Sequence, residues 1–475
     1  MKDNNSSLNF FIAVSHPEKM SFQLDQAGAD FSHNQVLLNT LIGTLVKYGQ
    51  SGRIEPYLAE SWAISEDAKT WSFKLRSGLV SQHGVEINAA LFSAKLQQSL
   101  HSLAQKGSVM VFDQLEGWSD FIKNKADRIH GIKVSGNVLE FHFQYPPDSF
   151  LELLRMPYFG LWLYKDSQLD STAAYEILKH APSTVELQLR HHWFSARKNS
   201  IKNVQVQFSA LDKVHEQELT KTILRLPFFV KTDHDSKTGY WIISPPTRLE
   251  SFVLSPHKKN FFHQLENRKL FLSRIREKQM RDQKNTFFYP STPSEISTSN
   301  KIIPKYKNLE KAEVLTFALE RANYSKEEIQ YFSSLIEYAL KDSSIKFKIL
   351  ERDLKDQKWF EKTDSNRFFD ARISSVDTGA APLISSVNMM FCTKLGVQFP
   401  DPSKNICQLI QDSIKEHRSI DESFIQKFNQ SLYDDAVVIP LMHHSDKWLV
   451  SNDIAPKSLP PTTLYPQFEL IDLNP

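Results

Sequence analysis

Few residue groups in this 475-residue sequence have the types and spacing that enzyme chemistry requires. The sequence contains no G-x-x-x-x-G-K-[ST], G-x-G-x-x-G or G-x-S-x-G motif, so the common phosphate-binding, dinucleotide-binding and serine-hydrolase patterns are absent. His215-Glu216 lacks the second histidine of the zinc-protease motif H-E-x-x-H. Ser343-x-x-Lys346 is a bare S-x-x-K pair, which chance alone supplies in a chain of this length. We therefore expect a protein that is not an enzyme and needs no cofactor.

Two histidine doublets, His191-His192 and His443-His444, have the residue type that ligates transition metals. Adjacent residues on a strand point to opposite faces of a sheet, so each doublet would make a poor chelate. The more economical interpretation is solvated or core histidine, and we expect no metal site.

Composition indicates a globular protein with substantial cores. The length predicts about three domain-sized units, and 41% of the residues are hydrophobic and 12% aromatic. A formal charge of +2 gives no electrostatic reason to expect nucleic acid as a partner. The basic run from Arg274 to Lys284 is interpreted as a solvated helix face.

The compartment is left open by the sequence. No run approaches the ~18–20 apolar residues of a membrane-spanning helix, and the start, MKDNNSSLNF, has no apolar signal core. Either the protein is cytoplasmic, or Met1 follows an export signal that has been removed. The two cysteines, Cys392 and Cys407, are compatible with one disulfide in an oxidising compartment and equally with two buried thiols.

Period-two and helical spacings predict several elements. Trp71, Phe73 and Leu75 alternate with polar residues, which predicts a strand with one buried face. A helix is expected from a cap at Ser32 through residue 45, and another after the cap residue Asn88. A strand over 313–319, a helix over 325–339 and a strand over 345–349 predict a βαβ unit in a mostly parallel sheet.

The stretch from Ile54 to Leu79 resembles the signature of the extracellular solute-binding proteins of family 5, the oligopeptide- and dipeptide-binding type. That pattern runs P-x-L-A-E-S-W, then D-x-x-x-W-x-F-x-L-R-x-G. The matching residues are Pro56, Leu58, Ala59, Glu60, Ser61, Trp62, Asp67, Trp71, Phe73, Leu75, Arg76 and Gly78. These residues are expected to be scaffold, so the resemblance identifies the family and says little about the ligand.

The resemblance implies an α/β, two-lobed periplasmic-binding-protein fold of the large three-domain peptide-binding type, with mixed sheets. Base-domain segments would cover 1–45, 165–246 and 446–475, an inserted small domain 46–164, and the second lobe 247–445. The chain departs from the family pattern at His83-Gly84, where the family has Asp-Gly, and at Ser171 to Tyr175, where it has G-T-G-P-Y.

The resemblance also points to ligand-binding residues on two loops. Gly396 to Ser403 resembles the family's A-D-Y-x-D-P-S loop, in which the aspartate receives the α-ammonium group of a peptide. Gln398 stands at that position, and an amide cannot neutralise a buried cation. The candidate residues are Gly396, Val397, Gln398, Phe399 and Asp401 on this loop, and Ala27 and Asp30 near the N-terminus.

The expected function is the substrate-binding subunit of an ABC importer in the periplasm or at the cell surface. Its partners would be a small solute, peptide-like or an oligosaccharide, and a membrane permease, with the protein itself a monomer. The alternative is a degenerate binding-protein fold that acts as an interaction or sensor protein. Trp162, Trp193, Trp241 and Trp448 could line the cleft, but a core role is favoured for each.

Overall fold

The structure is a computed structural model in which the chain divides into two compact units. Unit 1 comprises Met1–Pro245, Gly379–Pro382 and Asp446–Pro475, and unit 2 comprises Pro246–Thr378 and Leu383–Ser445. The structure describes residues 6–14, 17–26, 33–105, 110–147, 150–197, 199–210, 220–226, 239–243, 248–255, 260–282, 306, 314–320, 324, 326–352, 369–377, 405–415, 422–444, 447–459 and 466–474. No helix within these ranges is long and apolar enough to cross a membrane.

A seven-stranded sheet forms the first core of unit 1, in the order β10-β11-β12-β1-β13-β20-β14. Its strands are β1 (Ser7–Val14), β10 (Tyr175–Ala181), β11 (Thr184–Leu189), β12 (Asn203–Ala210), β13 (Thr222–Leu226), β14 (Gly239–Ile243) and β20 (Lys447–Ser451). The central strand β1 runs parallel to both of its neighbours, and the outer pairs are antiparallel. Leu8, Phe10 and Ile12 alternate on the buried face of β1, as the period of two requires.

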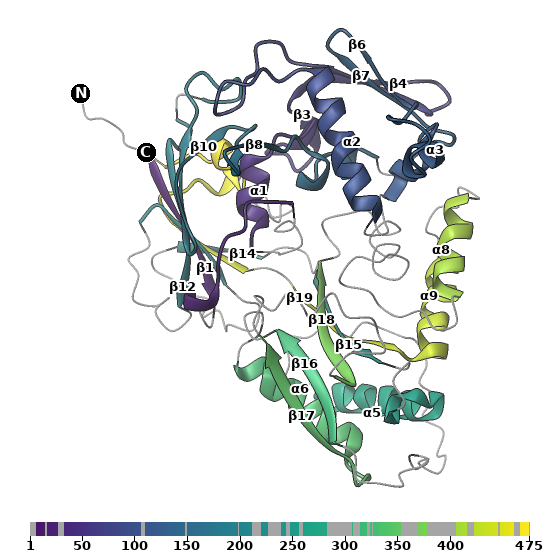
Figure 1. Ribbon diagram of the computed structural model, residues 1–475. Coiled ribbons are helices and arrows are strands. Elements are labelled where there is room, and N and C mark those ends of the chain that lie inside the picture. Colours follow the sequence, from purple (N-terminus) through teal and green to yellow (C-terminus); the bar gives the residue numbers. More distant parts are fainter. Residues whose placement is uncertain are drawn as a thin grey trace. The chain divides into compact units, whose positions relative to one another are not determined.

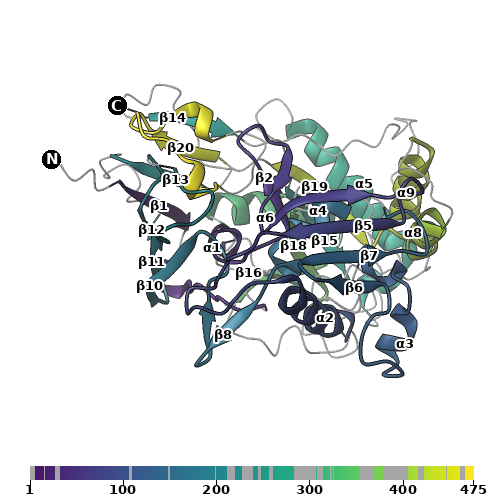
Figure 2. The same ribbon diagram turned by 90° about the horizontal axis from the view of Figure 1, so that it is seen from above.

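The signature stretch builds the second sheet of unit 1, in the antiparallel order β4-β5-β7-β6. Its strands are β4 (Ala59–Ile64), β5 (Thr70–Leu75), β6 (Ile132–Ser135) and β7 (Val138–His142). Trp71, Phe73 and Leu75 are buried on β5, so the predicted inward face is confirmed. Figure 2 shows these strands beside helix α2 (Ala89–Gln105), whose residues Phe92 and Leu96 are fully buried.

The N-terminus of α2 confirms the predicted cap, because the Asn88 side chain accepts a hydrogen bond from the Leu91 N–H at 2.9 Å. The prediction for the first helix was wrong in extent. Helix α1 covers only Gln35–Leu41, with Asn34 as its N-cap residue, and residues 46–48 already belong to strand β2. Ser32, the predicted cap, lies outside the described residues. The apolar run beyond Leu41 is buried as extended chain, which spacing alone does not distinguish from helix.

Short elements complete unit 1. They are β2 (Val46–Tyr48), β3 (Ile54–Pro56), α3 (Trp118–Ile122), α4 (Phe150–Leu154), β8 (Leu163–Lys165) and β9 (Gln168–Asp170). Single 3₁₀ turns lie at Pro17–Lys19, Met110–Gln114, Pro157–Phe159, Pro456–Ser458 and Phe468–Leu470. The last of these joins the chain end to β2, since Glu469 forms a buried ion pair with Lys47 at 2.7 Å.

Unit 2 is built on a five-stranded sheet in the order β17-β16-β18-β15-β19. Its elements are β15 (Arg248–Leu254), α5 (Leu265–Asp282), β16 (Val314–Glu320), α6 (Lys326–Leu340), β17 (Lys346–Arg352), β18 (Ala371–Asp377) and β19 (Val438–His444), with a 3₁₀ turn at Phe261–His263. Helices α5 and α6 lie alongside this sheet (Figure 1).

The predicted βαβ unit is confirmed by the parallel pairing of β16 and β17. The prediction of a mostly parallel sheet was wrong, because β15 pairs antiparallel with both β18 and β19. Those antiparallel partners come from distant parts of the chain, which a local pattern does not reveal. The predicted capping residue Ser325 lies outside the described residues.

The basic run on α5, predicted as a solvated face, is solvated only in part: the Arg281 side chain is 62% exposed and that of Lys278 26%, but two of its arginines are buried. Arg274 and Arg276 are only 3% and 8% exposed. The Arg274 guanidinium donates to the carbonyl oxygen of Ala339 at 3.0 Å and pairs with Asp342 at 3.1 Å. Burial lowers the pKa of Arg276 to about 10. Helix α5 packs against α6, and a buried arginine there can pack the aliphatic part of its side chain among apolar residues.

Candidate functional site

All seven candidate ligand-binding residues lie outside the described part of the chain: Ala27, Asp30, Gly396, Val397, Gln398, Phe399 and Asp401. The structure describes the residues that flank these two loops, and the polar contacts that hold the neighbouring segments of unit 1.

The segment with Ala27 and Asp30 is tied at its base. The Gln23 N–H donates to Oδ1 of Asn34 at 3.1 Å, which joins the two flanks of this segment. Asn34 is fully buried, and the Gln26 side chain donates to the Ser99 hydroxyl of α2 at 2.6 Å. Both ends of the predicted ligand loop are thus fixed on the scaffold.

An aromatic pair stands beside this segment. Tyr164 on β8 stacks on Trp162, with ring centroids 6.4 Å apart and planes at 18°. Burial, and after it the negative charge of Asp25, raises the pKa of Tyr164 to about 12 against the opposing effect of a hydrogen bond from the Gln26 backbone. Trp162 is buried but Tyr164 is 47% exposed, so one face of an aromatic ring is available next to an exposed carboxylate. Only the alternation of Trp162 and Tyr164 could have indicated this pair in the sequence.

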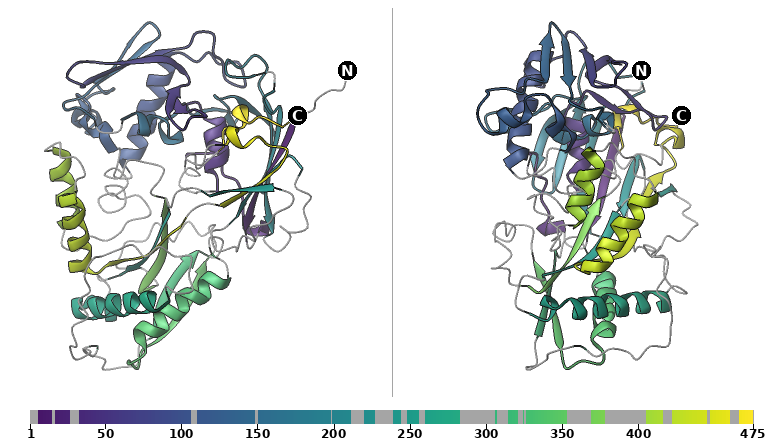
Figure 3. Two further views of the ribbon diagram at one scale, coloured as in Figure 1. Left: turned by 180° about the vertical axis from the view of Figure 1, so that it is seen from behind. Right: turned by 90° about the vertical axis from the view of Figure 1, so that its right-hand side faces the viewer.

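The residues that follow the second loop are anchored in unit 2. Helix α8 (Asn405–Lys415) packs with α9 (Glu422–Asp435), and Figure 3 shows the two helices side by side. Ile406 and Ile410 form an apolar cluster with Val253, Phe424 and Val438. Cys407 of α8 is disulfide-bonded, and the sequence contains one other cysteine, Cys392.

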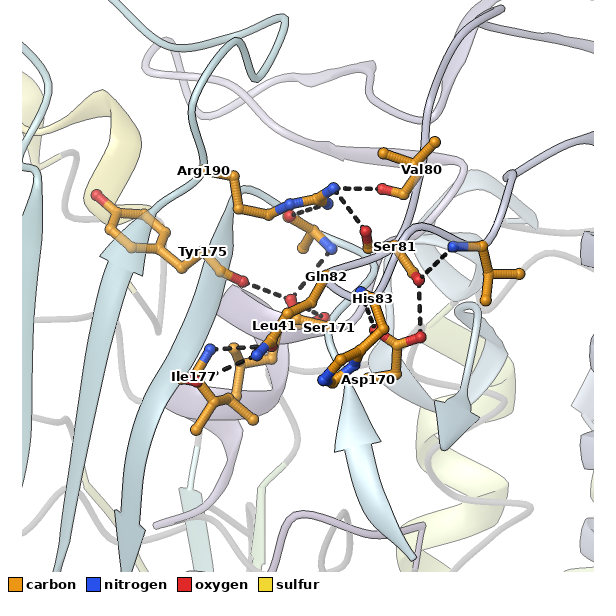
Figure 4. Close-up of polar contacts among 12 residues, drawn as sticks. Leu41, Val80, Ser81, Gln82, His83, Asp170, Ser171, Tyr175, Ile177 and Arg190 are labelled. Carbon is orange, nitrogen blue, oxygen red and sulfur yellow. Dashed lines mark hydrogen bonds and ion pairs between the residues drawn. The ribbon is translucent and has the colours of Figure 1, made fainter. Parts of the chain in front are cut away.

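A buried carboxylate organises the turn at residues 81–84 (Figure 4). Asp170 is 1% exposed and accepts three hydrogen bonds. The donors are the Ser81 hydroxyl at 2.7 Å, the His83 backbone N–H at 3.0 Å and the His83 ring Nδ1 at 3.0 Å. This turn is one of the places where the chain departs from the family pattern. Here the turn has His83 in place of the pattern's aspartate, and His83 bonds to a carboxylate 87 positions away.

Arg190 holds the same turn from the other side (Figure 4). Its guanidinium donates to the carbonyl oxygens of Ser81 at 2.9 Å and Ala173 at 3.1 Å, and to that of Val80. Burial lowers the pKa of Arg190, while the nearby negative charges, including Asp170, oppose that shift. The argument from sequence found neither Asp170 nor this role of Arg190, because their partners are distant in the chain.

Of the two glycines in the G-T-G-P-Y pattern, the first is replaced by Ser171, which forms hydrogen bonds, and the second by Ala173, while Thr172 keeps the pattern's threonine. Ser171 Oγ lies 3.0 Å from the carbonyl oxygen of Leu41 and 2.5 Å from that of Tyr175. Thr172 Oγ1 donates to the Leu161 carbonyl and accepts from the Gly43 N–H, both at 2.8 Å. Three separate segments of unit 1 are therefore fastened by two buried hydroxyls.

The tryptophans confirm the core interpretation where the burial is clear. Trp162, Trp193 and Trp448 are at most 5% exposed, and Trp241 packs against an apolar cluster of the seven-stranded sheet.

The argument about the first histidine doublet was wrong, because His191 and His192 lie in a turn and not on a strand. Within the described ranges, no group of three or more His, Cys, Asp or Glu side chains could hold a metal ion.

Parts of the chain are similar in sequence to known solute-binding proteins. Residues 53–259 match the bacterial extracellular solute-binding proteins, family 5 middle region. Sixty residues are 38% identical to the nickel-binding periplasmic protein of Escherichia coli (strain K12), which is 12% of either chain. A stretch of 122 residues is 25% identical to the dipeptide-binding protein DppE of Bacillus subtilis (strain 168), covering 25% of this chain and 22% of that relative. The matched segments thus span less than a quarter of either relative.

The fold match extends over the whole chain. The structure of the Escherichia coli murein tripeptide binding protein MppA is similar over 99% of both chains, with a TM-score of 0.76 and 15% sequence identity. This confirms the predicted fold class, the mixed α/β architecture of the large peptide-binding type. The family model thus accounts for residues 53–259, less than half of the 475-residue chain, and the likeness to MppA shows the fold.

Proposed function

We propose that the protein is the substrate-binding subunit of an ABC importer, which binds a peptide-like or other small solute and delivers it to a membrane permease. The observation that carries this proposal is the likeness to MppA over 99% of both chains, together with the family 5 match at residues 53–259. In such a protein the two lobes close on the solute and no covalent chemistry is needed, so we propose no enzymatic role.

The proposed location is the periplasm or the cell surface, and the proposed working form is a monomer. The family is an extracellular one, and DppE and MppA are named as dipeptide- and murein tripeptide-binding proteins. The division into base segments 1–45, 165–246 and 446–475, an inserted domain 46–164 and a second lobe 247–445 remains a prediction.

The ligand-binding residues are proposed to be those of the two loops, with Gln398 the most informative. An amide can accept a hydrogen bond from an ammonium group but cannot neutralise it. We therefore expect weaker binding of free peptide N-termini than an aspartate would give, and a ligand that is blocked or differs chemically, such as a cell-wall peptide or an oligosaccharide.

A thermal-shift screen tests the function, with pools of free peptides, N-acetylated peptides and oligosaccharides. A ligand at about 100 times its Kd stabilises the folded state by about 2.7 kcal/mol, which is a shift of several degrees. Stabilisation by one pool would support the importer subunit, and no response to any pool would contradict it. Gln398→Asp should gain affinity for free peptides over their acetylated forms. Equal affinity would refute the role of Gln398 and leave the function standing.

A further inference from the structure

The turn between β11 and β12 presents two adjacent histidines to solvent. His191 and His192 are both exposed, and the backbone at His192 is left-handed, with φ of 64°. That conformation is uncommon for any residue except glycine. The doublet is therefore not on an extended strand, and the alternation of neighbouring side chains between two faces does not apply to it.

The two imidazole rings lie unusually close together. Their centroids are 3.7 Å apart and their planes are nearly perpendicular, at 88°. Aromatic pairs normally lie about 4.5–7 Å apart. An ion bound at about 2.0–2.1 Å by two imidazole nitrogens requires those nitrogens to be about 3 Å from each other. In the observed edge-to-face arrangement the in-plane nitrogen lone pairs do not converge on one point, so binding an ion requires at least one ring to rotate, which two exposed side chains this close together can do.

The residues on either side of the doublet hold it in place. Arg190 is bonded to three carbonyl oxygens, as described above, and its guanidinium lies 4.9 Å from the centre of the Trp193 ring. Trp193 is 5% exposed. Because both flanks are fixed, the backbone of the doublet is already ordered, and the entropy lost when the two histidines close on an ion is mainly that of their own side chains.

We propose that His191 and His192 form a two-histidine surface site for a divalent transition-metal ion of the borderline class, Cu²⁺, Ni²⁺ or Zn²⁺. Imidazole suits these ions, and Cu²⁺ is expected to bind most tightly. No third His, Cys, Asp or Glu joins the pair among the residues that the structure describes, so water or an external ligand completes the coordination. The nearby Arg190 charge repels the ion and limits the affinity.

Copper titration of the whole protein tests the site, with calorimetry for affinity and electron paramagnetic resonance for the ligand atoms. We expect one Cu²⁺ per chain at this site, with hyperfine splitting from two nitrogens. His191→Ala should weaken that binding by about tenfold or more. His192→Gly should do the same, and glycine suits the left-handed backbone, so this variant is expected to fold.

His130→Ala is the matched control, because His130 is also exposed on unit 1 but is not adjacent to another histidine. It should leave the two-nitrogen site unchanged. Wild-type protein that binds no copper, or both doublet variants binding as wild type does, would overturn the proposal. Solute-induced thermal shifts should survive in both doublet variants, so failure of the metal site is distinguishable from failure of the transport function.

Discussion

Asp170→Ala should destabilise unit 1 by about 3 kcal/mol. The substitution removes a buried acceptor of three hydrogen bonds, from the Ser81 hydroxyl, the His83 N–H and the His83 ring. Hydrogen bonds to a charged group contribute about 1.5–3 kcal/mol each. The His83 ring is 32% exposed on its side chain, so its pairing is screened and contributes much less. The buried Ser81 hydroxyl and the partly buried His83 N–H therefore dominate the expected loss.

Chemical denaturation and hydrogen exchange measure this effect at two levels. In Asp170→Ala the free energy of unfolding should fall by about 3 kcal/mol. The amides of residues 80–87 and 170–177 should exchange faster than in the wild-type protein, with a smaller change in unit 2. Asp170→Asn keeps one acceptor oxygen and should lose about half as much. Asp127→Ala, an exposed position of unit 1, should change stability by less than about 0.5 kcal/mol.

The reasoning about this carboxylate would be refuted by an Asp170→Ala protein as stable as the Asp127→Ala control. It would also be refuted by faster exchange spread evenly over both units, because the carboxylate would then not be holding the 81–84 turn in particular.

Three further outcomes follow from the contacts of unit 1. Gly43→Ala places a methyl group 2.5 Å from a backbone carbonyl oxygen and should cost about 1–3 kcal/mol in thermal unfolding, whereas an alanine variant with no loss would show that the backbone can shift. Lys47→Met should lower the free energy of unfolding by about 3–5 kcal/mol, because it leaves Glu469 buried without its cation. In a double-mutant cycle, adding Glu469→Leu should recover most of that loss. After a pH jump to 11, the phenolate absorbance measured against a Tyr164→Phe reference should show Tyr164 largely protonated, because its pKa is raised to about 12. Asp25→Asn should lower that pKa, because it removes a nearby negative charge. A Tyr164 already ionised at pH 11 would contradict the assignment.

The sign for Tyr164 follows from linkage. The folded pKa is raised above the ordinary value of 10.0, so the neutral phenol is favoured in the folded state. The stability that this difference contributes is fully present below pH 10. It is lost as the pH rises toward 12, because the unfolded chain then gains more by ionising.

Local patterns predicted those elements whose period matches their burial. β5, α2 and the β16-α6-β17 unit appear where alternation or helical spacing placed them, because one face of each is buried against a core formed nearby in sequence. α1 ended early because the residues after Leu41 are apolar for another reason, namely burial as extended chain. The charge run on α5 misled because arginine can be buried when carbonyl oxygens and a carboxylate receive its donors.

The polar contacts of unit 1 could not be predicted from the sequence. Asp170 and Ser81 are 89 residues apart, and nothing in either local pattern marks them as partners. The sequence shows that the chain departs from the family pattern at His83 and at Ser171. It does not show that Asp170, the residue before Ser171, bonds to His83. Asp170 and His83 become hydrogen-bond partners only in the folded chain.

Native mass spectrometry of the purified protein, before and after mild denaturation and refolding, tests the central claim most directly. We expect that a small molecule dissociates on denaturation, that its mass falls in the range of a short peptide or an oligosaccharide, and that adding it back stabilises the refolded protein. A protein that carries no such molecule, and that no pool of peptides or oligosaccharides stabilises, would contradict the proposal that it binds a solute for transport.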